Sequence, residues 1–252
     1  FSECTRLAFI DIPNGVTSIG NRAFSGCVLM PSITIPDGIT VIQEMTFSRC
    51  YQLKSITIPE GVTSIGDGAF SKCDGLTSVV IPSKVTVLGP GVFFYCSRLE
   101  SVTLPEGITL LPDYLFYGCS SLTSLAIPES VVSIGTETFR ECGRLKAITI
   151  PDSVKSIGDN AFFYCIGLTT VEIGKGLEFL GNSVFQMCTY ISTFTFDGVK
   201  EPLNGVNVFG LCQELPWVTV PLEYEDKTFA GLPVCKERVT ATSTAANEPT
   251  PL

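Results

Sequence analysis

Apolar residues recur along the chain in a fixed order instead of forming long runs. In the unit that begins at Cys50, the apolar set is Leu53, Ile56, Ile58, Val62, Ile65, Ala69 and Phe70. Residues 55–58 alternate polar and β-branched apolar side chains, which predicts a strand. Pro59 ends this strand because proline has no N–H for a sheet ladder. Residues 62–65 predict a second short extended piece, and Gly66-Asp67 predicts a turn.

The same order repeats through most of the sequence. The cysteines are Cys4, Cys27, Cys50, Cys73, Cys96, Cys119, Cys142, Cys165, Cys188, Cys212 and Cys235, and every step is 23 residues except one of 24. Phenylalanine follows the same period from Phe1 to Phe209. One unit has too few apolar residues to close a core, but stacked copies pair their strands in parallel and share one interior. We therefore predict a repeat solenoid of about ten repeats over residues 1–235.

The order Cys-x-x-Leu-x-x-Ile-x-Ile-Pro-x-x-Val-x-x-Ile-Gly-x-x-Ala-Phe resembles the 23-residue treponemal, or BspA-like, class of leucine-rich repeats. The resemblance extends from residue 1 to about 196 and continues weakly to about 235. It implies a right-handed coil with parallel β-strands on the concave face and short irregular or helical turns on the convex face. It also implies a non-enzymatic, protein-binding surface or secreted protein of bacteria, adhesin-like or scaffold, whose partner is a host matrix or surface protein.

The two ends of the chain depart from the repeat. The consensus erodes after Gly174, and the 24-residue step falls between Cys188 and Cys212. We expect a degenerate C-terminal repeat from about residue 197 that caps the open end of the stack. Residues 236–252 are rich in Ser, Thr, Ala and Pro, which predicts a flexible tail. Phe1 opens the chain inside a repeat, so we expect that any leader has been removed.

Composition narrows the functional classes. The net charge is −9, which argues against a nucleic-acid partner. The chain has no run of 18 apolar residues, so the sequence predicts no transmembrane segment. The chain has no histidine, so it has neither a Ser-His nor a Cys-His dyad. The cysteines lack the short paired spacing of zinc sites and would stack in register. We expect no enzyme activity, no metal and no cofactor, and a buried ladder of free thiols.

Two surfaces follow from the repeat register. Outward positions on the first strand form the candidate concave binding face, which comprises Thr57, Thr103, Thr149, Glu172, Thr195 and Trp217. Acidic residues also fall in register at the loop edges, at Asp37, Glu60, Glu106, Glu129 and Asp152, and in the glycine turn at Glu44, Asp67, Asp113 and Asp159. The strand face is either a solvated surface of good strand formers or a ligand surface. The acidic ladders either solubilise the protein or form an edge that binds cations or a basic partner.

Aromatic residues gather in a few copies where the others carry small or polar side chains. They are Phe94, Tyr95, Tyr114, Tyr117, Phe163 and Tyr164. Contiguous exposed apolar surface marks interfaces, and tyrosine suits them because it joins an apolar ring to a polar tip. The group predicts a patch that binds a partner or a second copy of the chain. The alternative is that these residues only add packing on the convex side and bind no partner. A homo-oligomeric structural spacer, and a carbohydrate-binding module that stacks sugars on Tyr95, Tyr117 and Tyr164, are the other functional alternatives. A second apolar group, Val41, Val87, Leu110 and Phe179, is expected beside the second strand.

Overall fold

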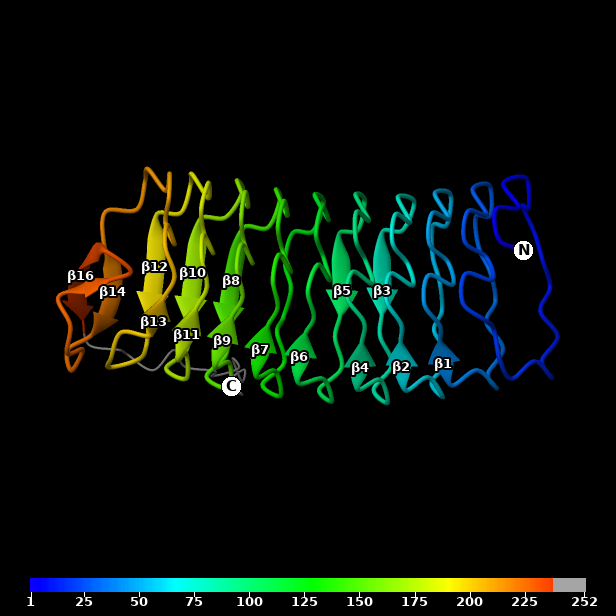
Figure 1. Ribbon diagram of the computed structural model, residues 1–252, viewed down its shortest axis with the longest axis horizontal. Helices are drawn as coiled ribbons and strands as arrows, with labels where there is room; N and C mark the ends of the chain where they lie inside the picture. The colour runs from blue at the N-terminus through cyan, green and yellow to red at the C-terminus, as the bar shows by residue number, and fades with distance from the viewer. Residues whose placement is uncertain (238–252) are drawn as a thin grey trace, which may run out of the picture.

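Each repeat winds once around a long axis, and most repeats contribute short strands to two parallel ladders (Figure 1). The computed structural model describes residues 1–237. The first ladder contains β3 (Ser78–Val80), β5 (Ser101–Thr103), β8 (Ala147–Ile150), β10 (Thr170–Ile173), β12 (Thr193–Phe196) and β14 (Val218–Pro221). The second contains β1 (Val41–Ile42), β2 (Ser64–Ile65), β4 (Val87–Leu88), β6 (Leu110–Leu111), β7 (Ser133–Ile134), β9 (Ser156–Ile157), β11 (Phe179–Leu180) and β13 (Leu203–Asn204).

The register of these ladders equals the sequence repeat. Val171 of β10 pairs with Ile148 of β8 on one side and with Phe194 of β12 on the other, and all three are buried. Thr149 and Glu172, one position further on, are exposed. A slip by one residue would turn the whole buried set toward solvent, so the alternating pattern fixes the register. The predicted solenoid with parallel strands is confirmed.

Turns form the third side of each coil, and no helix occurs within residues 1–237. The backbone N–H groups of Phe47 and Arg49 donate to the carbonyl oxygens of Ala69 and Ser71 in the next coil, at 2.8 and 2.7 Å. Similar bonds join successive coils along the stack, so the turns satisfy their backbone without helical hydrogen bonds. We expected irregular or helical turns here. The turns are irregular, and none is helical in this part of the chain. We call this side the turn face.

Phenylalanine rings form a continuous column inside the turn face. The rings are Phe1, Phe24, Phe47, Phe70, Phe93, Phe116, Phe139, Phe162, Phe185 and Phe209. Neighbouring centroids lie between 4.9 Å (Phe139 to Phe162) and 5.8 Å (Phe70 to Phe93), with nearly parallel planes. From Phe24 to Phe185 the column gives each coil a large buried anchor that contacts the coils on both sides.

The cysteines form a second column, and each thiol from Cys27 to Cys212 donates a hydrogen bond to a backbone carbonyl. Cys119 Sγ donates to the carbonyl oxygen of Phe93 in the preceding coil at 3.2 Å, and the same oxygen accepts the backbone N–H of Cys96 at 3.0 Å. This arrangement repeats from Cys27 to Cys212. All eleven cysteines are free, and those from Cys27 to Cys188 are buried. The predicted thiol ladder is confirmed, and it bridges each coil to the one before.

The C-terminal coils continue both ladders and end in a hairpin. β13 pairs with β11, and β14 pairs with β12. β15 (Thr228–Phe229) and β16 (Leu232–Glu237) pair antiparallel, and β16 also pairs in parallel with β14. The sheet therefore includes Lys236 and Glu237, so the tail predicted from residue 236 begins too early. The rest of that tail, residues 238–252, lies outside the described residues.

Shortening a ladder cysteine should destabilise the stack. Cys119→Ala removes the thiol that donates to the carbonyl oxygen of Phe93, and it leaves a small cavity. We therefore expect a loss of about 1–3 kcal/mol in the free energy of unfolding. Urea denaturation followed by circular dichroism measures this loss. Cys4→Ala is the matched control because Cys4 is exposed, and it should leave the midpoint unchanged. Equal losses in the two variants would show that the ladder bonds do not stabilise the fold.

The thiol ladder also predicts a dependence of stability on pH. Burial raises the pKa of the Cys50 and Cys96 thiols to about 12, whereas an unfolded cysteine has a pKa of about 8.5. The native state therefore holds these protons more tightly, so their stabilisation is complete below about pH 8.5 and falls as the pH rises toward 12. Urea midpoints measured under reducing conditions should be constant below about pH 8 and should fall above about pH 9. A midpoint that stays constant to about pH 11 would contradict this account.

Candidate functional site

The aromatic residues singled out in the sequence meet on the turn face. Phe94 contacts the Tyr95 ring at 4.8 Å and the Tyr117 ring at 5.1 Å, both edge to face, and Tyr95 and Tyr117 lie 5.1 Å apart. Tyr114 stacks on Tyr117 at 6.4 Å. Phe163 joins the group through the Arg140 guanidinium, which lies 4.6 Å from its ring centroid and 5.3 Å from that of Tyr117. We call these five aromatic residues and Arg140 the aromatic cluster.

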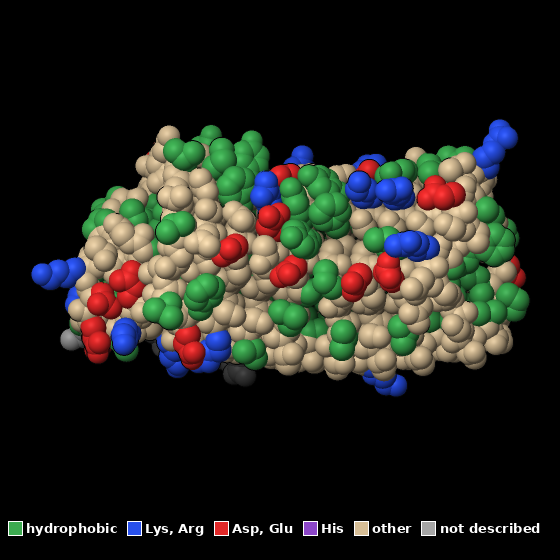
Figure 2. Space-filling model, viewed as in Figure 1, with side chains coloured by type: hydrophobic (Ala, Val, Ile, Leu, Met, Phe, Trp, Pro, Cys, Tyr) green, Lys and Arg blue, Asp and Glu red, His purple; other side chains and the backbone are tan. Residues whose placement is uncertain are grey.

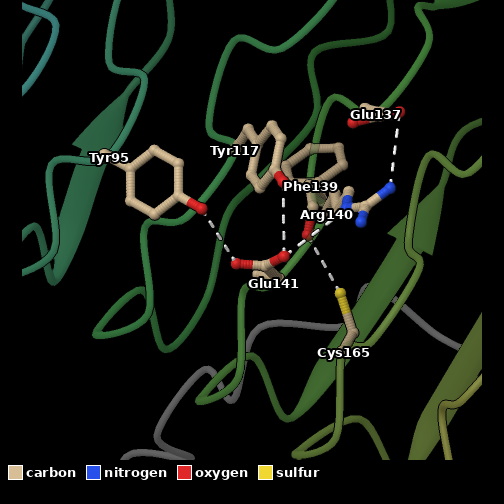
Figure 3. A network of polar contacts seen from close by, with 7 residues as sticks. All are labelled: Tyr95, Tyr117, Glu137, Phe139, Arg140, Glu141 and Cys165. Atoms are coloured by element: carbon tan, nitrogen blue, oxygen red, sulfur yellow. Dashed lines mark hydrogen bonds and ion pairs between the residues drawn. The ribbon is translucent and has the colours of Figure 1, made fainter.

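Two carboxylates hold the polar side of the aromatic cluster in place (Figure 3). Both Tyr95 and Tyr117 donate their hydroxyls to Glu141, one to each carboxylate oxygen, at 3.3 Å. Arg140 Nε lies 3.5 Å from Glu141, and Arg140 Nη1 lies 3.4 Å from Glu137. Cation–π contacts and these ion pairs fix the guanidinium between two rings. Sequence reasoning missed Arg140, Glu137 and Glu141, although Arg140 and Glu141 occupy the same repeat positions as Tyr117 and Tyr95.

Gly118 lets Tyr95 reach a carboxylate two coils away. Gly118 takes the repeat position just before the cysteine, where Tyr95 and Glu141 stand in the coils on either side. Its φ is +73°, and a Cβ at this position would lie 2.7 Å from Cδ1 of the Tyr95 ring. The absence of a side chain therefore leaves room for the ring to lie across the coil. The signal in the sequence that could have predicted this contact is a glycine at the repeat position that a tyrosine holds in the preceding repeat.

The cluster is partly exposed and electrostatically constrained. Tyr95 and Tyr114 are 36% and 39% exposed, whereas Phe94, Tyr117 and Phe163 are half-buried. Burial raises the pKa of Tyr117 to about 12, and the nearby Tyr95 hydroxyl and Glu141 carboxylate add to the rise. Tyr117 therefore stays protonated and continues to donate to Glu141 at neutral pH.

Tyr164 is set apart from the other predicted residues. It is 42% exposed and holds the same repeat position as Glu141 in the next coil. A backbone hydrogen bond from the N–H of Glu141 to the carbonyl oxygen of Phe163 joins these two coils. No aromatic ring within residues 1–237 packs against it. Tyr164 therefore extends the exposed aromatic surface beyond the aromatic cluster without being locked into it.

The candidate strand face is open and has few anchoring side chains. Thr57, Thr103, Glu172 and Trp217 are exposed, as is Thr149, while Thr195 is half-buried. Thr149 donates its hydroxyl to Glu172 at 3.2 Å. Trp217 is 49% exposed and lies at the C-terminal end of the first ladder, far from the threonines in the middle of the stack. This face lacks a group of large side chains held together, so its role as a binding surface stays a prediction.

The acidic residues of the turns have a structural role that sequence reasoning missed. Asp113 Oδ1 accepts the backbone N–H of Thr136 at 2.7 Å, and Asp159 Oδ1 accepts that of Asn182 at 2.7 Å. Each side chain lies over a glycine of the next coil, and a Cβ at Gly181 would lie 2.6 Å from Asp159 Oδ1. These carboxylates cap N–H groups where the second ladder ends. Among residues 1–237, no three potential metal-ligating side chains come together.

The second apolar group, expected beside the second strand, lies within the second ladder, where each member is the first residue of its strand. Val87, Leu110 and Phe179 are 57%, 46% and 44% exposed, and Val41 is half-buried. Ser64 separates Val41 from Val87, and Ser133 and Ser156 separate Leu110 from Phe179 along the ladder. The group is therefore divided into three parts and forms no continuous apolar surface.

Replacing Gly118 should disturb the aromatic cluster. In Gly118→Ala the new methyl group would displace the Tyr95 ring, in addition to the cost of about 1 kcal/mol for an alanine at positive φ. Gly231→Ala is the matched control because Gly231 also has a positive φ, +85°, but a methyl group there would meet no atom within 4 Å. We expect a lower urea midpoint in both variants. Only Gly118→Ala should change the tyrosine signal in the near-ultraviolet circular dichroism spectrum, and an unchanged spectrum would contradict the crossing.

Within the described residues, no helix is long and apolar enough to cross a membrane. No curated protein shows significant similarity to the chain. Among solved structures, a leucine-rich repeat protein from Bacteroides ovatus is 26% identical, with 94% of this chain and 86% of that chain covered and a TM-score of 0.55. The T. pallidum leucine-rich repeat protein is 28% identical, with 69% and 70% covered and a TM-score of 0.48. The pneumococcal vaccine antigen PcpA is 17% identical, with 89% and 75% covered and a TM-score of 0.50.

The family model for the BspA type leucine-rich repeat region matches residues 1–123 and 109–227. These matches cover most of the chain, and they agree with the 23-residue register and the paired parallel ladders. The chain belongs to the BspA-type leucine-rich repeat family.

Proposed function

We propose that this protein is a non-enzymatic binding protein, presented at the cell surface or secreted, whose aromatic cluster contacts a protein partner. The observation that carries the proposal is the preorganised aromatic surface on the turn face. Tyr95, Tyr114 and Tyr164 expose their rings there, and the hydroxyl of Tyr95 donates to Glu141, which pairs with Arg140.

Preorganisation favours binding because fewer side chains must be ordered when the partner arrives. Tyrosine adds a large contact area with few rotatable bonds, and its hydroxyl can exchange water for a partner group. Arg and Tyr are also enriched among residues that dominate binding energies. The hydroxyl-rich strand face offers small side chains instead, so it is the weaker candidate.

Family membership supports the location and the class. The resemblance of the repeats to BspA-like proteins favours a surface or secreted adhesin or scaffold, and the fold is shared with a pneumococcal vaccine antigen. The sequence has no histidine for a dyad with Ser or Cys. A net charge of −9 disfavours a nucleic-acid partner. A matrix or surface protein of a host is the partner class that this combination favours.

Binding to purified matrix proteins tests the proposal. The full chain is passed over immobilised collagen, laminin and fibronectin, and the affinity of any pair that binds is measured for Tyr95→Ser with Tyr164→Ser. We expect at least about a tenfold loss, since exposed aromatic anchors each contribute about 1 kcal/mol or more. Tyr51→Ser with Tyr190→Ser is the matched control, because those tyrosines are 38% and 61% exposed and lie outside the aromatic cluster. Equal losses, or binding to none of the three proteins, would contradict the proposal.

Light scattering separates this function from self-association. A monomer that keeps its mass at high concentration leaves the aromatic cluster free for a different protein. A discrete oligomer that dissociates in the Tyr95→Ser, Tyr164→Ser variant, but not in the Tyr51→Ser, Tyr190→Ser control, would replace the proposed function with self-association through the cluster.

A further inference from the structure

A hollow of about 450 Å³ lies on the turn face, in the coils that precede the aromatic cluster. Its lining residues are Ser2, Glu3, Arg22, Ser25, Met45, Ser48, Arg49, Ser71 and Lys72. Ser25, Ser48 and Ser71 hold the same repeat position in successive coils, and Arg49 and Lys72 hold the next one. Backbone bonds from Gly26 to Ser48 and from Arg49 to Ser71, at 2.8 and 2.7 Å, fix these coils side by side. The result is a column of hydroxyls beside a column of cations.

The serine hydroxyls of this hollow form no hydrogen bond to the protein. Ser25 and Ser48 are only 7% and 6% exposed. Within residues 1–237 no hydrogen bond joins either side chain, or that of Ser71, to another protein group. Their oxygens are not among the buried polar atoms that lack a partner, so each stays accessible at the surface. These hydroxyls can therefore donate to an acceptor that enters the hollow.

The charge of the hollow favours an anion. Arg49 and Lys72 form no ion pair within the described part of the chain, whereas Arg22 pairs with Glu44 at 3.0 Å. Glu3 is the carboxylate of the lining, and its side chain lies against the backbone of Gly26. Figure 2 shows Lys and Arg side chains along the upper edge of the molecule, on the N-terminal side of a hydrophobic patch. A local cationic surface on a protein of net charge −9 attracts anions specifically to that place.

An exposed aromatic ring continues the same column. The Lys72 N–H donates to the carbonyl of Phe94 at 2.7 Å, so Tyr95 follows Lys72 in the next coil, about 4.8 Å further along the stack. A ligand that extends along the stack would meet serine hydroxyls and two cations first, and a tyrosine ring next. Hydroxyl donors, cations and an aromatic face together match the hydroxyls, acidic groups and apolar ring face of an acidic sugar.

We propose that this hollow binds the sulfate or carboxylate group of an acidic oligosaccharide, with the adjacent sugar ring packed on Tyr95. Arg49 and Lys72 bind the oxyanion through charge-assisted hydrogen bonds, and Ser48 and Ser71 donate to its remaining oxygens. The site goes beyond the proposed protein-binding function, because Arg49, Lys72 and the serines lie outside the aromatic cluster and Tyr95 is the one residue that the two share.

Titration calorimetry with a heparin-derived tetrasaccharide tests the proposal, on the full chain in about 50 mM salt so that screening is limited. Arg49→Gln with Lys72→Gln should lower the affinity by about tenfold or more. Lys54→Gln with Lys84→Gln removes the same charge from exposed positions outside the hollow and should change the affinity by less than about twofold. Equal losses in the two double variants, or no binding by the unaltered protein, would overturn the proposal. Circular dichroism confirms that each variant is folded.

Three further arms identify the ligand chemistry. Inorganic sulfate alone should bind at least about tenfold more weakly than the tetrasaccharide, and a desulfated tetrasaccharide that keeps its carboxylates shows which oxyanion is preferred. Tyr95→Ser should weaken the tetrasaccharide but not inorganic sulfate. Glu3→Gln should strengthen both, because it removes the competing carboxylate. Equal affinity for sulfate and tetrasaccharide, with no effect of Tyr95→Ser, would overturn the saccharide assignment. None of these measurements uses a protein partner, so they fail or succeed independently of the proposed function.

Discussion

Parallel pairing in register is the constraint on which the rest of the structure depends. Because each strand pairs with the same strand of the neighbouring coil, every residue stacks on its repeat equivalents at the spacing of a β-ladder. A residue type that repeats in every coil must therefore pack against the same residue type in the coils on both sides. Phenylalanine does so by parallel stacking, as between Phe47 and Phe70 at 5.6 Å. Cysteine does so because its thiol donates to the backbone of the preceding coil, so no copy needs another cysteine as its partner.

The surface gains its chemistry where a column departs from its repeat. On the turn face one column passes from Ser71 to Phe94, Tyr117, Arg140 and Phe163, and its neighbour passes from Lys72 to Tyr95, Gly118, Glu141 and Tyr164. The backbone bonds between coils are the same throughout, so these changes alter the side chains without altering the scaffold. A hydroxyl-lined cationic hollow and a locked aromatic cluster therefore lie next to each other on one rigid face.

The sequence was sufficient for the parts of the structure that repeat. The period of the cysteines, the alternation in residues 55–58 and the proline that follows predict the parallel ladders and the buried thiols. The aromatic residues could also be recognised, because they break the pattern. The contacts among them could not, since Tyr95 bonds a carboxylate 46 positions away only because Gly118 leaves room between them. Likewise, the capping role of Asp113 depends on an N–H in the next coil, and the inclusion of Lys236 in β16 depends on pairing with β14.

Residues in register across successive coils act together, and a double-mutant cycle between Tyr95 and Glu141 measures this coupling. Tyr95→Phe removes only the hydroxyl, and Glu141→Gln removes the charge and replaces one of the two acceptor oxygens with an NH2 group. The free energies of unfolding of the two single variants and the double variant give the coupling between residues two coils apart. We expect a coupling of about 0.5–1 kcal/mol, as for a partly exposed hydrogen bond to a carboxylate. Losses that simply add would mean that the two side chains do not act together, and that the aromatic cluster is not held in place by its carboxylate.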